Sequence, residues 1–213
     1  HAALKADYVI ANPPFNDGSK GQQGWGADRI PDRDPRLTIE VTDKDGRKTK
    51  PTLAPRNANT MWILHFLHHL ADGGTAGFVM ATGELSNSEL ARLEVRRALV
   101  EHDYVDCIVQ LPGQLFANTQ IPCVLWFLSK GRDGRSGHRE RKGEVLFIDA
   151  RKLGSLIPGS RKQKQLAADE VERIAQVYRT FKRTWRPDGV PGFFQVATAA
   201  EVAEHRFVLT PGR

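Results

Sequence analysis

The sequence predicts an α/β fold: half of a doubly wound sheet, mostly parallel, with one antiparallel hairpin and a small helical C-terminal extension. Short apolar runs alternate with segments of helical periodicity, which is typical of a parallel sheet with helices on both faces. The later part of the chain carries one strongly amphipathic helix. With 213 residues, 40% of them hydrophobic, the chain can form a sizeable core in one domain or one and a half.

The expected strands follow the apolar runs in chain order. Residues 7–11 read as a short apolar strand, and we expect this first strand to be buried on both faces. Further strands are expected at residues 76–81, 105–111, 121–128 and 145–150, where Pro122 marks the start of the strand that contains it.

Helical periodicity marks the segments between and after the strands. Asn59 or Thr60 can cap a helix that runs to about Ala71, and a second helix is expected over residues 88–102. Residues 198–201 form a capping box that opens a short final helix. The most amphipathic helix begins at Asp169, and its apolar side chains recur at helical spacing: Val171, Ile174, Ala175, Tyr178, Phe181 and Trp185.

Composition excludes several classes of protein. The net charge of +6, from 31 basic and 25 acidic residues, suits a polyanionic partner. No apolar run approaches the roughly 20 residues needed to cross a bilayer, so we expect a soluble protein without membrane contact. Cys107 and Cys123 lie in apolar runs, which indicates buried thiols in a reducing, cytoplasmic compartment. His65, His68 and His69 have no carboxylate at ligand spacing, so we expect no metal site.

The segment that carries chemistry is Asn12-Pro13-Pro14-Phe15, directly after the first apolar run. A planar amino nitrogen is a poor nucleophile because its lone pair is delocalised, and two acceptors at its hydrogens can draw it toward tetrahedral geometry. The Asn12 side-chain oxygen and the Pro13 carbonyl can be those acceptors. The two prolines stiffen the loop, and Phe15 offers a face on which an extruded base can stack. The alternative is a plain Asx-Pro turn; the four residues together favour the chemical interpretation.

Beyond this motif, the segments 57–59, 62, 68–70, 105–108, 125–128, 146–151 and 207–213 carry a resemblance to one family. The most specific stretch runs from Leu111-Pro112-Gly113-Gln114-Leu115-Phe116 through Thr119-Gln120-Ile121-Pro122. Over nearly its whole length the chain resembles the modification (M) subunit of type I restriction-modification systems, an adenine-N6 DNA methyltransferase.

The resemblance implies transfer of a methyl group from S-adenosyl-L-methionine to N6 of adenine in double-stranded DNA, with Asn12, Pro13, Pro14 and Phe15 as catalytic residues. It implies the C-terminal half of a class I methyltransferase sheet in residues 1–150, with residues 151–213 as a helical extension packed on it. The family's glycine-rich cofactor loop and acidic residue precede the motif. We therefore expect the cofactor to be bound mainly by residues upstream of this chain, with Asn12 at the shared edge, and the isolated chain to be inactive. The implied partners are DNA, a specificity (S) subunit and a restriction (R) subunit.

Other functions stay open at this point. Asn-Pro-Pro-aromatic serves any planar amino group, so a protein-glutamine or RNA amino-methyltransferase is an alternative, although those families usually carry Tyr at the position of Phe15 and end soon after the sheet. A non-catalytic remnant without cofactor binding is another. Asn57 and Asn59 match family positions and either reach the site or cap a helix.

Four further segments have a predicted role or a pair of alternatives. Residues 16–55 form a lid or DNA-facing loop, or a disordered insertion, with a small hairpin in which residues 38–41 turn at Asp45-Gly46. Residues 130–142 and 161–164 are basic; the first is expected to be an exposed loop that contacts phosphate or is merely solvated. The helix over residues 169–185 is expected to pack partly on the sheet and partly against the specificity subunit.

Overall fold

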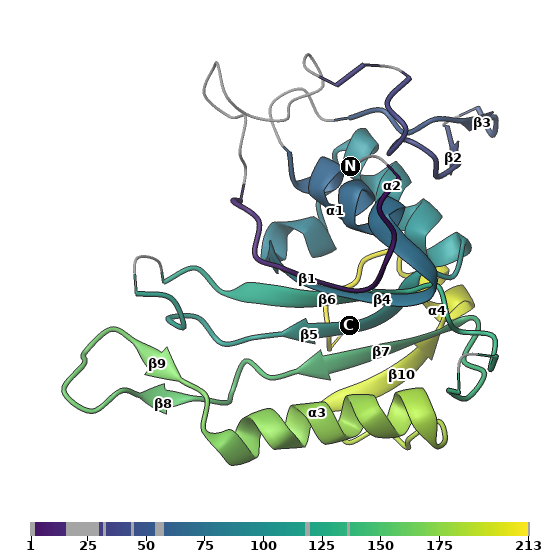
Figure 1. The fold of residues 1–213 in the computed structure, drawn as a ribbon. Helices are drawn as coiled ribbons and strands as arrows, with labels where there is room; N and C mark the ends of the chain where they lie inside the picture. The colour runs from purple at the N-terminus through teal and green to yellow at the C-terminus, as the bar shows by residue number, and fades with distance from the viewer. Residues whose placement is uncertain are drawn as a thin grey trace.

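The protein is described by a computed structural model over residues 3–15, 30–31, 33–43, 45–53, 58–117, 120–135 and 137–212. Its core is a six-stranded mixed sheet with the strand order β1-β4-β6-β5-β7-β10 (Figure 1). Four strands run in one direction and two run against them. The parallel set is β1 (Ala6–Ala11), β4 (Leu70–Ala81), β5 (Val105–Gln110) and β7 (Glu144–Asp149); the opposed strands are β6 (Cys123–Ser129) and β10 (Phe194–Thr198). The predicted α/β class with its antiparallel β5–β6 hairpin is confirmed.

Helices cover both faces of the sheet, and each face has its own core. The helices α1 (Asn59–His69) and α2 (Leu90–Glu101) lie on one face, and α3 (Ala168–Arg183) lies along the other (Figure 1). Phe78 and Trp126 belong to the core on the α1 and α2 side, whereas Cys107 and Val109 pack with Phe181 of α3. The short helix α4 (Ala199–Glu204) contacts α2 and β10.

Each of the four predicted helices is present in the described residues, with one correction at a helix start. The final helix α4 is capped as predicted, because Thr198 Oγ1 accepts the Glu201 N–H at 3.2 Å and Glu201 accepts the Thr198 N–H at 2.7 Å. The α1 helix starts differently: its N-cap residue is Ala58, and no side chain caps it. Capping by Asn59 or Thr60 was therefore wrong. The helix ends at His69, and β4 follows directly from Leu70, earlier than predicted.

Several small strands complete the fold. The hairpin of β2 (Val41–Thr42) and β3 (Lys48–Thr49) turns at the predicted place, where Gly46 has a φ of 78°. The β8 (Ser155–Leu156) and β9 (Lys164–Gln165) hairpin and the edge strand β10 were not predicted. Within the long polar segment, residues 16–29 lie outside the described residues. Its later part packs on the helical layer through buried Leu37, Ile39 and Val41.

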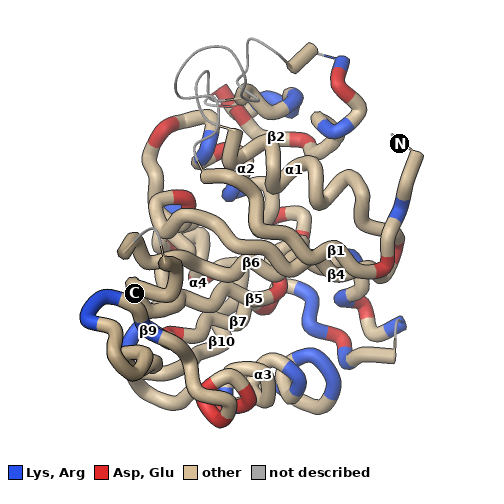
Figure 2. The backbone as a smooth tube through the Cα atoms, turned by 60° about the vertical axis from the view of Figure 1, so that its left-hand side comes forward, with Lys and Arg blue, Asp and Glu red and all other residues tan. Residues whose placement is uncertain are grey.

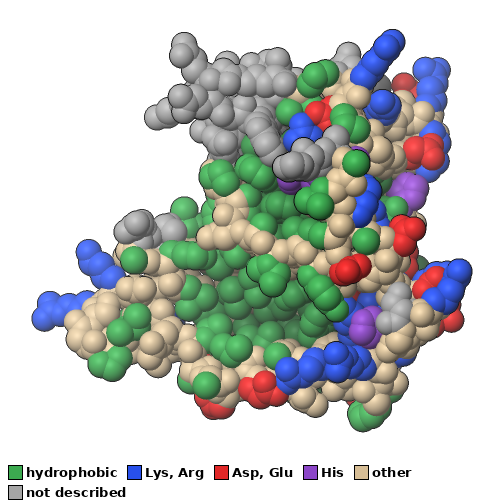
Figure 3. Space-filling model, viewed as in Figure 1, with side chains coloured by type: hydrophobic (Ala, Val, Ile, Leu, Met, Phe, Trp, Pro, Cys, Tyr) green, Lys and Arg blue, Asp and Glu red, His purple; other side chains and the backbone are tan. Residues whose placement is uncertain are grey.

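The first strand is not buried on both faces, contrary to the prediction. Val9 and Ala11 pack on the α1 side of the sheet, whereas Tyr8 and Ile10 on the opposite face are 75% and 92% exposed. The physical reason is that α3 covers β5 and β7 but does not reach β1, whose one strand neighbour in the described part of the chain is β4. Figure 3 shows the resulting hydrophobic surface in the middle of the molecule.

Candidate active site

The Asn-Pro-Pro-Phe motif lies at the carboxyl edge of the sheet. Because β1 runs parallel to β4, with Ala11 opposite Phe78, the chain leaves the sheet on the side where β4, β5 and β7 also end. This is the edge at which open α/β sheets bind their ligands. Pro13 is buried while Asn12 is exposed. The first proline thus anchors the loop, and the amide that follows the strand stays accessible.

Phe15 packs against a hydrophobic cluster on which the loop that follows β5 also packs. Its half-buried ring belongs to the same hydrophobic cluster as Leu115 and Phe116. That loop folds back tightly: a Cβ at Gly113 would lie 2.9 Å from the Gln120 carbonyl oxygen. Sequence reasoning assigned no site role to Leu115 or Phe116, although the resemblance of residues 111–116 to one family was a signal that this loop belongs to the site.

A buried polar cluster fixes the other segments at this edge. Asn59 is fully buried and donates from Nδ2 to Glu84 Oε1 at 2.8 Å, and Arg92 Nη1 donates to the same oxygen at 3.2 Å. Glu84 lies in η2 (Thr82–Leu85), the 3₁₀ turn after β4. Asn59 thus ties the start of α1 to the end of β4 instead of capping the helix. Asn57 lies outside the described residues.

The cluster extends to the C-terminus through Arg96. Its guanidinium donates to the carbonyl oxygens of Phe207 at 2.6 Å, Glu84 at 3.2 Å and Asn87 at 3.0 Å. Burial lowers the Arg96 pKa to about 10, so the group remains charged at neutral pH. One side chain on α2 thus ties the segment after β4, residues 84–87, to Phe207 near the C-terminus.

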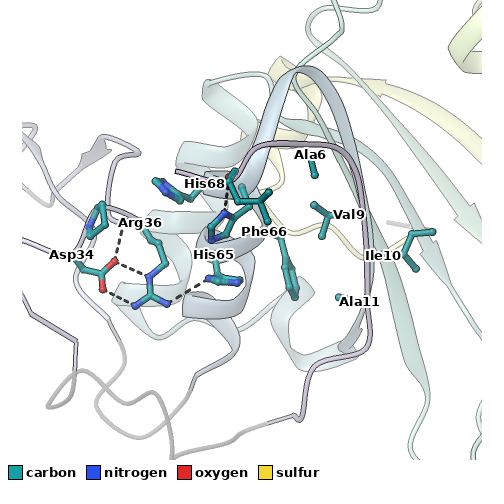
Figure 4. Close-up of a pocket in the computed structure, with 12 residues that line it drawn as sticks. Ala6, Val9, Ile10, Ala11, Asp34, Arg36, His65, Phe66 and His68 are labelled. Atoms are coloured by element: carbon teal, nitrogen blue, oxygen red, sulfur yellow. Dashed lines mark hydrogen bonds and ion pairs between the residues drawn. The ribbon is translucent and has the colours of Figure 1, made fainter. Parts of the chain in front are cut away.

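A cavity of about 660 Å³ lies beside β1 on the α1 side (Figure 4). Its polar wall is Asp34, Arg36 and His65: Arg36 donates to both Asp34 oxygens at 2.8 and 2.6 Å, and its Nη1 lies 3.5 Å from His65 Nδ1. The Arg36 guanidinium holds the Asp34 pKa at about 2, and burial lowers the His65 pKa to about 4. The wall is therefore an ion pair beside a neutral imidazole, while β1 supplies apolar side chains opposite.

The close packing at Gly74 has a structural explanation within the sheet. A Cβ at Gly74 would lie 3.0 Å from the Ala6 carbonyl oxygen and 3.1 Å from that of Asp7, so this glycine allows β4 to pack closely on the start of β1. That place is at the amino edge of the sheet, away from the motif. Gly24 and Gly26 lie outside the described residues. In the described ranges, no group of three or more His, Cys, Asp or Glu side chains could hold a metal ion.

The basic segment 130–142 is exposed only in part, whereas the prediction was an exposed loop. Arg132 and Arg141 are buried and pair with acids on β5 and before it: Arg141 Nε lies 2.7 Å from Asp106 and Arg132 Nη2 lies 3.2 Å from Asp103. The segment connects β6 to β7 at the amino edge of the parallel strands. The exposed cations of the segment include Arg135, whose side chain is 85% exposed, and Lys142. Phosphate contact by Arg132 or Arg141 is thus excluded by their burial.

The comparisons with known proteins agree with this geometry. The family model for N-6 DNA methylases matches residues 1–213. The chain is 43% identical over 209 residues to the type I restriction enzyme MjaIX methylase subunit of Methanocaldococcus jannaschii, covering 97% of this chain and 34% of that protein. It is 35% identical over 213 residues to the HindI methylase subunit of Haemophilus influenzae, covering all of this chain and 42% of that protein. The chain therefore spans well under half the length of these relatives.

Solved structures support the fold. The methyltransferase subunit of a type I restriction-modification system from Streptococcus thermophilus matches with a TM-score of 0.71 at 24% identity, over 98% of this chain and 38% of that one. The type I restriction enzyme EcoKI M protein matches with a TM-score of 0.55 at 20% identity, over 82% of this chain and 31% of that one. No helix in the described ranges is long and apolar enough to cross a membrane.

Proposed function

The chain belongs to the N-6 DNA methylase family, and we propose that it is the catalytic part of a site-specific adenine-N6 DNA methyltransferase, the modification subunit of a type I restriction-modification system. The observation that carries the proposal is the position of Asn12–Phe15 at the carboxyl edge of β1, in a chain that matches the family over its whole length. The relatives favour adenine in DNA over a glutamine or RNA substrate.

In this proposal the motif holds the target base after it has left the duplex, which costs a few kcal/mol of stacking and pairing. Phe15 stacks on the base. Asn12 Oδ1 and the Pro13 carbonyl oxygen accept the two amino hydrogens and aim the nitrogen lone pair at the methyl group. Positioning of this kind supplies much of the rate. After alkylation the nitrogen is acidic and loses a proton to water or through these acceptors.

S-adenosylmethionine is the proposed methyl donor, held mainly by residues upstream of this chain. The support is that one edge and one face of β1 are left uncovered by the described residues. Parallel strands are normally covered on both faces, and an exposed apolar edge strand invites further pairing. Ile10 and Tyr8 project from this strand into solvent, and Asn12 follows it directly. We place the cofactor-binding half against this edge, so that Asn12 lies where the two halves meet and residues 1–213 alone are inactive.

The test of the chemistry is substitution of the motif in the complete methyltransferase. Asn12→Ala is expected to abolish methylation while DNA binding stays nearly intact, because it removes an acceptor needed in the transition state. Phe15→Ala should weaken binding of the flipped base, and Phe15→Tyr should be tolerated. A rate above a tenth of the wild-type value for Asn12→Ala, a loss under ~1.4 kcal/mol, would refute the acceptor role.

A second test addresses the cofactor half. A polypeptide with the upstream half of a methylase subunit is mixed with this chain, and methylation of duplex DNA is measured. Ile10→Asp should prevent complementation without destabilising the chain itself, because the side chain is 92% exposed. Leu90→Asp, at a residue that is 52% exposed at the start of α2, is the matched control and should complement normally. Equal complementation by both variants contradicts the docking of that half on β1.

The remaining parts of the proposal follow from family membership. We assign residues 1–150 to the catalytic half of the methyltransferase domain and residues 151–213 to an extension packed on it. The proposed partners are double-stranded DNA, which suits the net charge of +6, and the specificity and restriction subunits of a type I system in the cytoplasm.

A further inference from the structure

The β8–β9 hairpin projects from the same edge of the sheet as the catalytic motif. In Figure 1 it extends beyond the carboxyl ends of β5 and β7, on the side to which β1 also runs. Ser155 pairs with Gln165 and Leu156 with Lys164, and the Ile157 N–H donates to the Gln163 carbonyl oxygen at 2.9 Å. The turn between them places Arg161 and Lys162 at the exposed tip.

The hairpin and its base are more basic than the chain as a whole. Residues 151–166 contain five basic residues and no Asp or Glu, whereas the whole chain has a net charge of only +6. Arg151 is paired with Asp149 at 2.6 Å, at the base of the hairpin. The basic residues beyond it are Lys152, Arg161, Lys162 and Lys164. Figure 2 shows the basic positions around β9, and Figure 3 shows their side chains extending into solvent.

The base of the hairpin is fixed to the loop that follows β5. The Lys164 N–H donates to the Gln114 carbonyl oxygen at 2.8 Å, and a Cβ at Gly154 would lie 3.6 Å from Pro112. Leu115 and Phe116 of that loop share a hydrophobic cluster with Phe15, and Leu153 and Leu166 at the two ends of the hairpin belong to it as well. The base of the hairpin and the catalytic loop therefore pack on the same part of the core.

The start of α3 fixes the hairpin from the other side. Glu170 accepts the Gly154 N–H at 2.9 Å and the Ala167 N–H at 2.8 Å, so one carboxylate bridges both ends of the hairpin. The Glu170 carboxylate is hydrogen-bonded at the base of the hairpin, so it does not neutralise the positive charge at the tip. A basic tip on a rigid base suits a ligand with regularly spaced negative charges.

We propose that the β8–β9 hairpin is an arm that binds the DNA backbone beside the base that enters the Asn12–Phe15 site. The inference rests on the proposed function, because it takes duplex DNA as the substrate. Arg161 and Lys162 neutralise phosphates next to the target nucleotide, and the rigid base sets how far from those phosphates the base can enter. Phosphate contacts position a protein on DNA without reading sequence, which leaves recognition to other parts of the complex.

A protein partner is the other class of ligand for such a hairpin, and the observations favour DNA. A protein interface is depleted of Lys and is centred on large apolar or aromatic side chains. On this hairpin the one large hydrophobic residue that is more than a third exposed is Leu156, at 50%. Four Lys or Arg residues without an acid in the same segment instead match the electrostatic footprint of a nucleic-acid contact.

The test compares two double variants that remove the same charge at opposite edges of the sheet. Arg161→Gln with Lys162→Gln alters the hairpin tip, and Arg135→Gln with Lys142→Gln alters the exposed cations at the amino edge. Binding of a fluorescent duplex by the chain is measured by anisotropy over a range of KCl concentrations. The hairpin variant is expected to lower the slope of log K against log[KCl] by roughly 1.8, which is about 0.9 per phosphate contact. The control variant is expected to keep the wild-type slope.

Three results would overturn the proposal: equal slopes for the two variants, no salt-dependent DNA binding by the wild-type chain, or a hairpin variant that binds DNA normally but loses the specificity subunit. Unfolding midpoints of both variants should match the wild type, because the substituted side chains are exposed. Methylation by the complete enzyme is measured in parallel. A hairpin-dependent slope without methyl transfer to adenine supports the arm and contradicts the proposed function, so the two failures are distinguishable.

Discussion

The buried carboxylate Asp106 offers the sharpest test of what holds this fold together. It lies on β5 beneath α3 and is inaccessible to solvent. Arg141 donates to it from Nε at 2.7 Å and from Nη2 at 3.2 Å, and the Tyr178 hydroxyl donates at 2.8 Å. Arg132 Nη1 lies 3.7 Å away. Burial raises the Tyr178 pKa well above its usual value, so the phenol stays protonated and remains a donor.

Asp106→Ala is expected to lower the free energy of unfolding by about 3–5 kcal/mol. The change leaves the Arg141 guanidinium, with a fully buried side chain, without its acid, and an unpaired buried charge is far more costly than the pair is stabilising. For a chain of this size each kcal/mol shifts the unfolding midpoint by roughly 2–4 °C, so the expected fall is about 6–20 °C. Asp106→Leu combined with Arg141→Met should be less destabilised than Asp106→Ala alone.

The assay is thermal and urea unfolding followed by circular dichroism at neutral pH. Glu101→Ala is the control, because the Arg97–Glu101 pair at 2.6 Å is about a third exposed on both sides. Exposed pairs of this spacing contribute about 0.3–0.5 kcal/mol, so the control should lose no more than that. A loss below about 1 kcal/mol for Asp106→Ala, similar to the control, would refute the argument that this buried pairing is a main support of α3 on the sheet.

Three other outcomes are expected. Burial holds the His65 pKa at about 4 against an ordinary 6.5, so the contribution of the neutral imidazole to stability is complete above pH 6.5 and is lost as the pH falls toward 4. Thermal scans over that pH range should show a smaller loss of stability for His65→Gln than for the wild type, since the neighbouring Asp34 titrates lower, near 2. Titration calorimetry should show that the isolated chain binds S-adenosylmethionine with a dissociation constant weaker than about 10 μM, roughly −7 kcal/mol. Tighter binding would contradict the proposal that the cofactor is held mainly by residues upstream of this chain. Hydrogen exchange with and without the specificity subunit should show added protection in residues 169–213, where Val171 and Trp185 are 50% and 61% exposed; unchanged protection means that α3 is ordinary core.

The sequence could predict those helices and strands that are specified by local patterns of residues. Helix α2 lies within two residues of the predicted range, and its face with Ala91, Val95, Ala98 and Leu99, at helical spacing, is buried. Phe181 of α3 is also buried as the apolar spacing requires. These features depend on neighbours within one or two helical turns, so the chain itself carries the information. The two-residue strands β8 and β9 have no periodicity that a local pattern could reveal.

Burial of β1 could not be predicted, because it depends on neighbours far away in the sequence. An apolar run shows that a strand can be buried, but the neighbouring elements of the sheet determine which of its faces are covered. Here Val9 packs on α1 while Ile10, the next residue, faces solvent. The edge strand β10 shows the converse case: it pairs with β7 across about 45 residues, which no local signal indicates. The place of Asn12 at the strand end was predictable, but the packing of Leu115, Phe116 and Phe15 against one cluster was not.

The two basic segments show why the number of charged residues in a segment does not predict whether it stabilises the fold or binds a ligand. Residues 130–142 and 151–166 have similar content of Lys and Arg, and a local reading treats both as exposed. The first meets Asp103 and Asp106 at the amino edge of the sheet, where Arg132 and Arg141 are buried structural ions. The second meets only Asp149 and Glu170 at its base, so its tip stays charged in solvent at the carboxyl edge. The position of acids in space, and not the number of cations, therefore decides which basic segment stabilises the fold and which one remains available to a ligand.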